Sequence, residues 1–338
     1  MLEVIGIGNA ICDILVKVED SFFEKIPYEK SSMSLISHDE ANQLLDFIAR
    51  AEYKYTISSG GSVANTMALL AKLGVNSEFV GNVSENFYGK RFVKDITASG
   101  AKFINLHEEE DTTSAKCIVL VAEDGERTLC TYLGCSSYLR FDDKFIKTNI
   151  TSNIKYGYLE GYIFDNPLAT KEIFKVLTAT ADIKYILTLS DKGCIERNRS
   201  VITEIIKLHT NTLIGNDSEF AELLDLDSLT KDNIEAASSL LQLYPNLENL
   251  VITFNKVGSC YINRSGITFV ATEAVKPCDS TGAGDAFAAG YIYGLVRDLD
   301  PVKSCKIGNV LAGNVIAHLG ARPDIAMPLI NEQIKKIA

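Results

Sequence analysis

The 338-residue sequence has no tryptophan, no CxxC pair and no Walker A motif of the form GxxxxGK[ST]. Its eight cysteines are scattered and its four histidines show no ligand spacing, which disfavours a structural zinc site. It has no apolar run long enough to span a bilayer, and its first residues lack the basic segment of a signal peptide. These absences predict a cytoplasmic protein with reduced, mostly buried thiols.

Acidic residues outnumber basic ones, and the net charge is −11. Such a charge disfavours non-specific binding to nucleic acid and leaves small-molecule chemistry open. An anionic substrate would need local positive dipoles or Mg²⁺ to overcome the overall field. The mean hydropathy of +0.08 and the length fit one large α/β domain with an appendage.

The most informative stretch is residues 278–290, which read CDSTGAGDAFAAG. Phe287, Gly290, Tyr291 and Gly294 recur at helical spacing, so a helix is predicted to begin near Gly282. The first N–H groups of such a helix and its dipole form an anion site. Without a Walker A motif, the backbone of residues 282–284 (Gly282, Ala283 and Gly284) is the predicted anion cradle.

Asp285 lies directly beside this predicted anion cradle. A carboxylate in the first turn of a helix suits the dipole, so helix-end electrostatics alone could explain it. It is badly placed beside a bound anion unless it handles a proton. A kinase-type transfer needs that arrangement, with donors for the moving phosphoryl group and a base for the attacking hydroxyl. We therefore favour catalysis.

The N-terminal run at residues 2–8 predicts a buried strand that ends in glycine. The following residues begin like a dinucleotide fingerprint, but Ile11 stands where the third glycine would be, which argues against a nicotinamide dehydrogenase. Asp13 lies just past this strand. It is either a turn aspartate or a ligand-binding group, because open α/β sheets bind ligands at the carboxyl ends of their strands.

Strand and helix patterns alternate from residue 76 to 214. This alternation predicts an α/β fold whose central, mostly parallel sheet is flanked by helices. Four further strands interrupt the alternation, in two insertions, and predict either a small β-sheet beside the main body or edge strands of the main sheet. They lie at residues 14–18, 32–36, 115–121 and 127–132.

Three motifs together resemble the ribokinase-like (PfkB) family of carbohydrate and nucleoside kinases, closest to its adenosine-kinase-like branch. They are DSTGAGD at residues 279–285, GGSVAN at 60–65 and NDSE at 216–219. The resemblance implies a core of residues 1–11, 37–111 and 134–338, and a β-sheet lid of residues 12–36 and 112–133. It also implies ATP as co-substrate, Mg²⁺, and K⁺ as a further cation.

The resemblance assigns a role to each motif position. Asp285 is the expected catalytic base, with Gly282, Ala283 and Gly284 as the anion hole. The expected acceptor-binding residues are Asn9, Asp13, Gly60, Gly61 and Asn65. The expected ATP-binding residues are Asn216, Thr253, Gly258 and Asn309. Glu219 is expected to support Mg²⁺ through water, and Asp279 and Thr281 to lie near a monovalent cation.

Several of these residues have simpler explanations in the sequence. Gly60 and Gly61 form a tight turn before a helix, and Asn216 with Glu219 fits a capping box. Asn309, taken alone, reads as an exposed helix residue. Asn255 replaces the glycine that the family usually carries, which leaves the path of that loop open.

The sequence predicts an ATP-dependent kinase that phosphorylates a primary hydroxyl, with the 5′-OH of adenosine as the favoured acceptor. A free sugar such as ribose or fructose is the first alternative. A non-catalytic sugar or nucleotide sensor on the same fold is the alternative of another class, and the intact Asp285 and Glu219 argue against it. A homodimer through the lid is also expected, and neither nucleic acid nor membrane is an expected partner.

Overall fold

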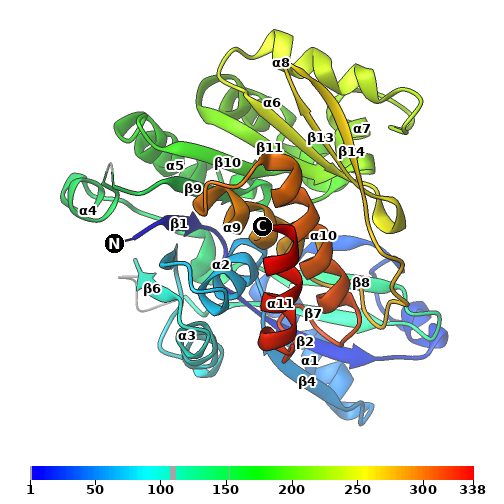
Figure 1. The fold of residues 1–338 in the computed structure, drawn as a ribbon. Helices are drawn as coiled ribbons and strands as arrows, with labels where there is room; N and C mark the ends of the chain where they lie inside the picture. The colour runs from blue at the N-terminus through cyan, green and yellow to red at the C-terminus, as the bar shows by residue number, and fades with distance from the viewer. Residues whose placement is uncertain (1, 107–111, 152) are drawn as a thin grey trace.

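The structure, a computed structural model, describes residues 2–106, 112–151 and 153–338. Within these residues the chain forms a nine-stranded sheet and a separate five-stranded sheet. Figure 1 shows the larger sheet between two groups of helices, with the smaller sheet beside it. The predicted fold class is therefore confirmed, and the extra strands form a sheet of their own.

The nine-stranded sheet is parallel from β6 to β12, and the last two strands run antiparallel. In spatial order its strands are β14 (Gly266–Ala271), β13 (Gly258–Asn263), β12 (Asn249–Thr253), β11 (Thr210–Asn216), β10 (Lys184–Thr188), β9 (Tyr156–Glu160), β1 (Val4–Ile7), β5 (Ser77–Gly81) and β6 (Lys102–Asn105).

Alternate residues of the parallel strands pack against opposite layers of helices. Val4 and Tyr158 belong to one core cluster, whereas Ile5 and Leu159 belong to the other. The first layer holds α2 (Ser62–Lys72), α3 (Phe87–Ala98), α9 (Ala283–Val296), α10 (Pro301–Ile316) and α11 (Met327–Ile337). The second holds α4 (Asp143–Asn149), α5 (Pro167–Ala179), α6 (Lys192–His209), α7 (Asp217–Leu223) and α8 (Ser239–Leu243). Burial on both faces explains the continuous apolar runs of these strands.

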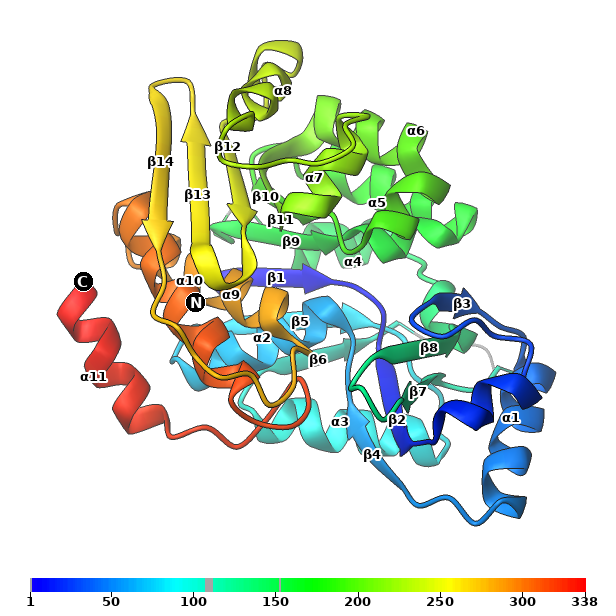
Figure 2. The ribbon, with the colours of Figure 1, turned by 90° about the vertical axis from the view of Figure 1, so that its right-hand side faces the viewer.

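The five-stranded sheet, which we call the lid, covers one end of the main sheet (Figure 2). Its order is β3 (Met33–Leu35), β8 (Arg127–Tyr132), β7 (Ala115–Val121), β2 (Ile11–Lys17) and β4 (Tyr55–Ser59). On its outer face, alternate residues such as Ile14 and Ile118 pack with α1 (His38–Arg50). The inner face therefore presents the other residues of each strand, among them Asp13, towards the core.

The predicted lid boundaries differ from the structure at β4 and α1. Residues 37–111 were expected in the core, yet β4 pairs with β2 and α1 covers the lid. The apolar pattern that predicts the other strands does not reveal β4, because β4 is a polar edge strand whose Tyr55 is half exposed. β14 and α11 were not predicted either. Five short 3₁₀ helices complete the described chain: η1 (Asp20–Lys25), η2 (Gly134–Ser137), η3 (Gly161–Asp165), η4 (Ile234–Ser238) and η5 (Asn255–Val257).

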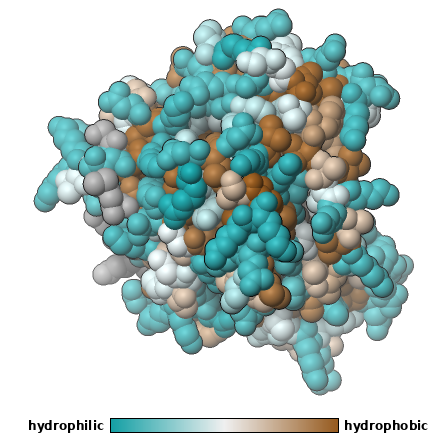
Figure 3. Space-filling model, in the orientation of Figure 1, coloured by the Kyte–Doolittle hydropathy of each residue, from teal (hydrophilic) through white to brown (hydrophobic). Residues whose placement is uncertain are grey.

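Most cysteines are buried, as the sequence predicts. Seven of the eight cysteines are buried, and Cys278 alone is exposed. The face drawn in Figure 3 is mainly hydrophilic, with apolar residues in small separate areas. No helix in the described ranges combines the length and the hydropathy needed to cross a bilayer.

Helices α9 and α10 touch through glycine, and this contact sets the position of the 278–290 motif. A Cβ atom on Gly290 would lie 2.6 Å from the backbone nitrogen of Gly308. Because both atoms belong to helix interiors, a side chain there would force the helices apart.

We expect Gly290→Ala to lower the free energy of unfolding by roughly 1–3 kcal/mol through overpacking. Gly313→Ala, in α10, is the matched control, because its Cβ would meet only Val275, at 3.3 Å. We expect the control to stay within about 1 kcal/mol of the parent. Urea denaturation measures both, and equal stability of the two variants would contradict the packing argument.

Candidate active site

A cavity of about 450 Å³ lies between the lid and the carboxyl ends of the parallel strands. This is where open α/β sheets bind ligands. The residues that line it include most of those singled out from the sequence: Asn9, Asp13, Gly61, Asn216, Glu219, Thr253, Thr281, Gly282, Ala283, Gly284 and Asp285. The structure thus brings together segments that lie more than 200 residues apart in the chain.

The 282–284 turn leads into α9 as predicted. Gly282 precedes the helix with a φ of 76°, a left-handed conformation that favours glycine. The first helical hydrogen bond runs from the amide of Ala286 to the carbonyl of Gly282, at 2.8 Å. The amides of Gly284 and Asp285 therefore have no acceptor within the helix. They are free to bind an anion in the cavity.

Asp285 is held by two side chains from the start of α2. Ser62 Oγ donates to its Oδ1 at 2.6 Å, and Asn65 Nδ2 donates to its Oδ2 at 2.8 Å. Burial raises the pKa of Asp285, while these two hydrogen bonds lower it by favouring the ionised form. The result is a fixed carboxylate, next to free amides, that retains affinity for a proton.

The two glycines before α2 each make room for an acceptor-side group. A Cβ on Gly60 would lie 2.3 Å from Asp13 Oδ2, and one on Gly61 would lie 2.2 Å from the carbonyl oxygen of Asn9. Gly61 also has a φ of 87°. Glycine is therefore required at both positions so that Asp13 and Asn9 can approach α2.

Asp13 faces the cavity from the lid strand β2. Burial raises its pKa to about 7, Arg322 and Arg127 lower it, and the charge of Asp285 raises it. Two carboxylates that share one cavity disfavour each other's ionisation. A ligand that offers hydroxyl donors to Asp13 would therefore find a strong acceptor.

Glu160 is a cavity residue that sequence reasoning missed. Its side chain is only 1% exposed, and its carboxylate accepts hydrogen bonds from the amides of Asn9, at 2.8 Å, and Val63, at 2.9 Å. It thereby ties β9 to β1 and to the first turn of α2, and burial raises its pKa to about 7. The signal that could have found it is an acid at the carboxyl end of a predicted buried strand.

Arg127 is the second residue that sequence reasoning missed. It stands on β8 of the lid and forms an ion pair with Asp279, whose side chain is almost fully buried. The same Asp279 carboxylate accepts hydrogen bonds from Thr281 N and Oγ1, both at 2.7 Å, and from the amide of Gly320 at 2.8 Å. The lid thus contacts Asp279, just before the anion cradle, through the guanidinium of Arg127. A basic residue just after the hairpin signal at residues 123–125 was the available clue.

Asn216 and Glu219 form the capping box that the sequence allowed. Asn216 Oδ1 accepts from the amide of Glu219 at 2.9 Å, and Glu219 Oε2 accepts from the amide of Asn216 at 3.0 Å. The pKa of Glu219 is raised to about 8, first by burial and then by the nearby acids Asp191, Asp217 and Asp285, against the lowering effect of the hydrogen bond from the Asn216 amide. A cation near Glu219 would relieve this repulsion.

The donor set of this cavity fits Mg²⁺, which prefers oxygen ligands and keeps several waters. Among the described residues no three His, Cys, Asp or Glu side chains converge as a metal-binding group. Glu219 would therefore hold the ion together with water and substrate phosphates, when it is bound.

Two expected ATP-binding residues do not line the cavity. Asn309 is 8% exposed rather than exposed, and its Nδ2 donates to the carbonyl of Val270 at 3.1 Å. Gly258 has a φ of 114°, and a Cβ there would lie 2.1 Å from the carbonyl oxygen of Val270. Both residues fix the β13–β14 hairpin. Asn255, in contrast, lines the cavity and adopts a left-handed φ of 45°, which asparagine tolerates well.

Comparison with known proteins decides the family, because residues 35–327 match the pfkB family carbohydrate kinase description. The chain belongs to the PfkB family. Kinases of this family are phosphotransferases that act on a hydroxyl group of a sugar or nucleoside. The chain is accordingly a sugar or nucleoside kinase, with ATP as co-substrate.

Individual relatives of this PfkB kinase include both nucleoside and sugar kinases. Adenosine kinase 2 of Arabidopsis thaliana is 20% identical over 92% of each chain, and probable fructokinase-7 of the same plant is 23% identical over 80% of each. The crystal structure of adenosine kinase from Sinorhizobium meliloti is 30% identical, with a TM-score of 0.86 over 98% of this chain and 99% of that one. A probable sugar kinase from Rhizobium etli is 27% identical, with a TM-score of 0.87 over 100% of this chain and 99% of that one.

The hydrogen bond from Ser62 to Asp285 predicts a measurable titration shift. Because the hydroxyl stabilises the ionised carboxylate, Ser62→Ala should raise the pKa of Asp285. Carbon-13 NMR of the aspartate carboxyl groups measures it. Ser239→Ala, which removes a hydroxyl in α8, should leave the resonance unchanged, and a downward shift in Ser62→Ala would contradict the assigned bond.

Proposed function

We propose that the chain transfers the γ-phosphate of ATP to the 5′-hydroxyl of a ribonucleoside, with adenosine as the favoured acceptor. The observation that carries this proposal is the Asp285 carboxylate, fixed beside the free amides of Gly284 and Asp285 and facing the cavity. A carboxylate and an anion cradle in that relation suit a base and the phosphoryl group that it serves.

In the proposed reaction Asp285 accepts the proton of the attacking hydroxyl. The amides at the start of α9 bind the phosphoryl oxygens, where negative charge accumulates during transfer. Asn9, Asp13, Gly60, Gly61 and Asn65 shape the acceptor side: Asp13 accepts from acceptor hydroxyls, while Gly60, Gly61 and Asn65 keep Asp13 and Asp285 in place. Mg²⁺, bound with ATP, neutralises phosphate charge.

The ATP side of the cavity lies at the ends of β11 and β12. Asn216, Thr253, Asn255 and Glu219 line it there. Glu219, which forms the capping box with Asn216, would support the metal through water. Gly258 and Asn309 act indirectly in this proposal, by holding the β13–β14 hairpin. Arg127 brings a positive charge to the cradle from the lid.

The lid supports a nucleoside over a free sugar. Five apolar side chains of the lid region line the cavity: Ile11, Met33, Leu35, Leu129 and Leu133. A nucleobase has apolar faces that could pack against such a wall. Ribose or fructose has none, so the apolar side chains would stay in contact with water. Calorimetry should therefore show adenosine binding at least about tenfold more tightly than ribose. Tighter binding of ribose or fructose would favour the free-sugar alternative.

A monovalent cation near Asp279 and Thr281 remains a proposal, and the structure supplies a competing group. Asp279 already carries the Arg127 ion pair and three hydrogen bonds. If a cation acts there, turnover should be faster in K⁺ than in an equal concentration of a large organic cation. Equal rates would show that the Arg127 guanidinium neutralises the charge of Asp279 without a bound cation.

A cytoplasmic location and a homodimer through the lid also remain proposals. The outer face of the lid sheet is buried under α1 of the same chain. A lid dimer would therefore have to form through one of the two edge strands, β3, where Leu35 is 43% exposed, or β4, where Tyr55 is 51% exposed.

The base assignment predicts that Asp285→Asn lowers kcat about 10²- to 10⁴-fold, the contribution typical of general-base catalysis. Binding of adenosine, measured by calorimetry, should persist because the amide keeps the shape of the carboxylate. Asp298→Asn, at an exposed position after α9, is the control and should turn over normally. Near-normal turnover by Asp285→Asn would rule out its role as the base. Absence of turnover in the parent chain, with ATP still bound, would favour the sensor alternative.

A further inference from the structure

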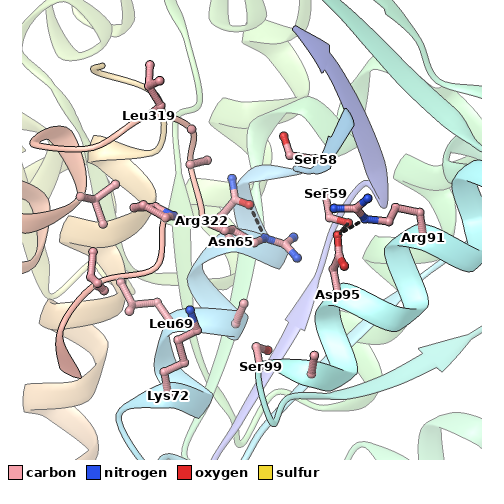
Figure 4. A pocket seen from close by; sticks show the side chains of 17 residues that line it. Ser58, Ser59, Asn65, Leu69, Lys72, Arg91, Asp95, Ser99, Leu319 and Arg322 are labelled. Carbon is pink, nitrogen blue, oxygen red and sulfur yellow. Dashed lines mark hydrogen bonds and ion pairs between the residues drawn. The ribbon is translucent and has the colours of Figure 1, made fainter. Parts of the chain in front are cut away.

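Arg322 lies behind the candidate active site, on the segment that follows α10. It lines a cavity of about 370 Å³ whose walls include α2 and α3, and its guanidinium reaches from there to Asn65 (Figure 4). Neither Asp13 nor Asp285 lines this cavity, and Arg322 does not line the candidate substrate cavity. Any effect of Arg322 on phosphoryl transfer must therefore pass through the residues that it contacts.

The guanidinium of Arg322 holds two groups at the entry to α2. Its Nε donates to Asn65 Oδ1 at 2.6 Å, and its Nη2 donates to the carbonyl oxygen of Gly60 at 2.8 Å. The guanidinium carbon also lies 5.6 Å from the centre of the Phe92 ring, within the range of a cation–π contact. Contacts with α2, with the turn before it and with α3 thus fix the guanidinium.

The side-chain amide of Asn65 connects this guanidinium to Asp285. Its Oδ1 accepts from Arg322, and its Nδ2 donates to Asp285 Oδ2 at 2.8 Å. A guanidinium can only donate hydrogen bonds, and an ionised carboxylate can only accept them. A reversed amide would turn its oxygen towards the carboxylate and its NH₂ group towards the cation, so both bonds would be lost. Arg322 therefore selects the one orientation of Asn65 that fixes Asp285.

The contact with Gly60 acts on the acceptor side of the site. A Cβ atom on Gly60 would lie 2.3 Å from Asp13 Oδ2, so the Asp13 carboxylate packs directly on the Gly60 backbone. Because Arg322 binds the carbonyl of Gly60, it fixes the backbone that Asp13 contacts. One guanidinium thus supports both carboxylates that the proposed reaction uses.

Arg322 also offsets the repulsion between these two carboxylates. Burial raises the pKa of Asp285 and that of Asp13, and the charge of Arg322 lowers both. Two buried carboxylates disfavour each other's ionisation, and a cation that faces both favours it. The titratable groups that face Asp285 or Arg322 from the neighbouring elements are Cys12 and Asp13 of β2, Asp95 of α3, Tyr158 and Glu160 of β9, and Glu219 of α7.

We propose that Arg322 is a positioning residue for phosphoryl transfer, whose guanidinium orients the Asn65 amide and thereby holds the Asp285 carboxylate in place. Arg322 acts only through these neighbours, because it does not line the cavity that would hold the acceptor. The inference rests on the proposed function, since it assigns Arg322 to the base of that reaction.

Arg322→Gln tests the proposal, because its neutral amide can donate or accept and so permits either orientation of Asn65. We expect kcat to fall about 10- to 100-fold, since a displaced catalytic group is costly. The pKa of Asp285 should rise, because no cation then favours its ionised form. The base must be ionised to act, so the acid limb of the kcat profile should move to higher pH.

Steady-state kinetics over a range of pH measure kcat, and carbon-13 NMR of the aspartate carboxyl groups follows the titration. The resonance that is missing in Asp285→Asn identifies Asp285. Arg322→Lys keeps a cation that only donates, so the pKa of Asp285 should stay close to that of the parent and part of the lost kcat should return.

Arg264→Gln is the matched control. Arg264 also binds backbone carbonyls, those of Leu241 at 3.0 Å and Pro245 at 3.1 Å, but it lines neither of the two cavities. This control should keep the kcat of the parent and its Asp285 titration. Circular dichroism and thermal unfolding establish that each variant is folded.

A folded Arg322→Gln variant with the kcat of the parent, or with an unchanged pKa of Asp285, would overturn the proposal. Equal losses in Arg322→Gln and Arg322→Lys would also overturn it, because they would reduce Arg322 to packing. If Arg322→Gln does not fold, Arg322→Lys decides alone: a raised pKa of Asp285 contradicts the proposal, and an unchanged one supports it. A parent chain that phosphorylates no acceptor would overturn the proposed function, while the NMR titration would still show whether Arg322 controls Asp285.

Discussion

The position of one carboxylate governs the arrangement of this kinase. Asp285 lies in the first turn of α9, yet the two hydrogen bonds that fix it come from Ser62 and Asn65, more than 200 residues earlier. The glycines at 60 and 61 permit the tight entry into α2 that places those side chains. Arg322 then closes the group from a third segment by binding both Asn65 and Gly60. Three distant parts of the chain must fold together before the Asp285 carboxylate is held in this position.

Negative charge is concentrated in the cavity and only partly balanced there. Asp13, Glu160 and Glu219 each have a pKa raised to about 7 or 8, mainly by burial. Arg322 and Arg127 lower the pKa of Asp13, whereas hydrogen bonds from Val63 and Asn9 lower that of Glu160 and one from Asn216 lowers that of Glu219. Such a site favours ligands that bring hydroxyl donors to the carboxylates or a cation to Glu219. Both fit the substrates of a kinase.

The fold could be predicted largely because its pattern is regular. Buried parallel strands read as short apolar runs, and helices α5 and α10 carry caps with proline in the first turn. The motif residues could be placed around one cavity because three motifs resemble the PfkB family, and most of them do line one cavity. β4 and β14 could not be predicted, since edge positions relax the demand for apolar residues.

The sequence did not predict the contacts of three residues of the site, namely Glu160, Arg127 and Arg322. Each of them binds residues that are distant in the chain, and its local sequence does not indicate which residues these are. Glu160 binds amides at residues 9 and 63, and Arg127 binds Asp279. The ATP-binding role of Asn309 stays a prediction, and its amide donates to the carbonyl of Val270, a contact that the sequence does not indicate either. Tertiary contacts decided all four cases.

The most direct test of the central claim is ADP release from Mg²⁺-ATP in the presence of single acceptors. The panel contains adenosine, inosine, guanosine, cytidine, ribose, fructose and fructose 6-phosphate. The account predicts rapid ADP release with adenosine or another ribonucleoside, and little with the free sugars. Rapid turnover of a free sugar alone would contradict the nucleoside assignment, and silence with every acceptor would contradict the catalytic role of Asp285.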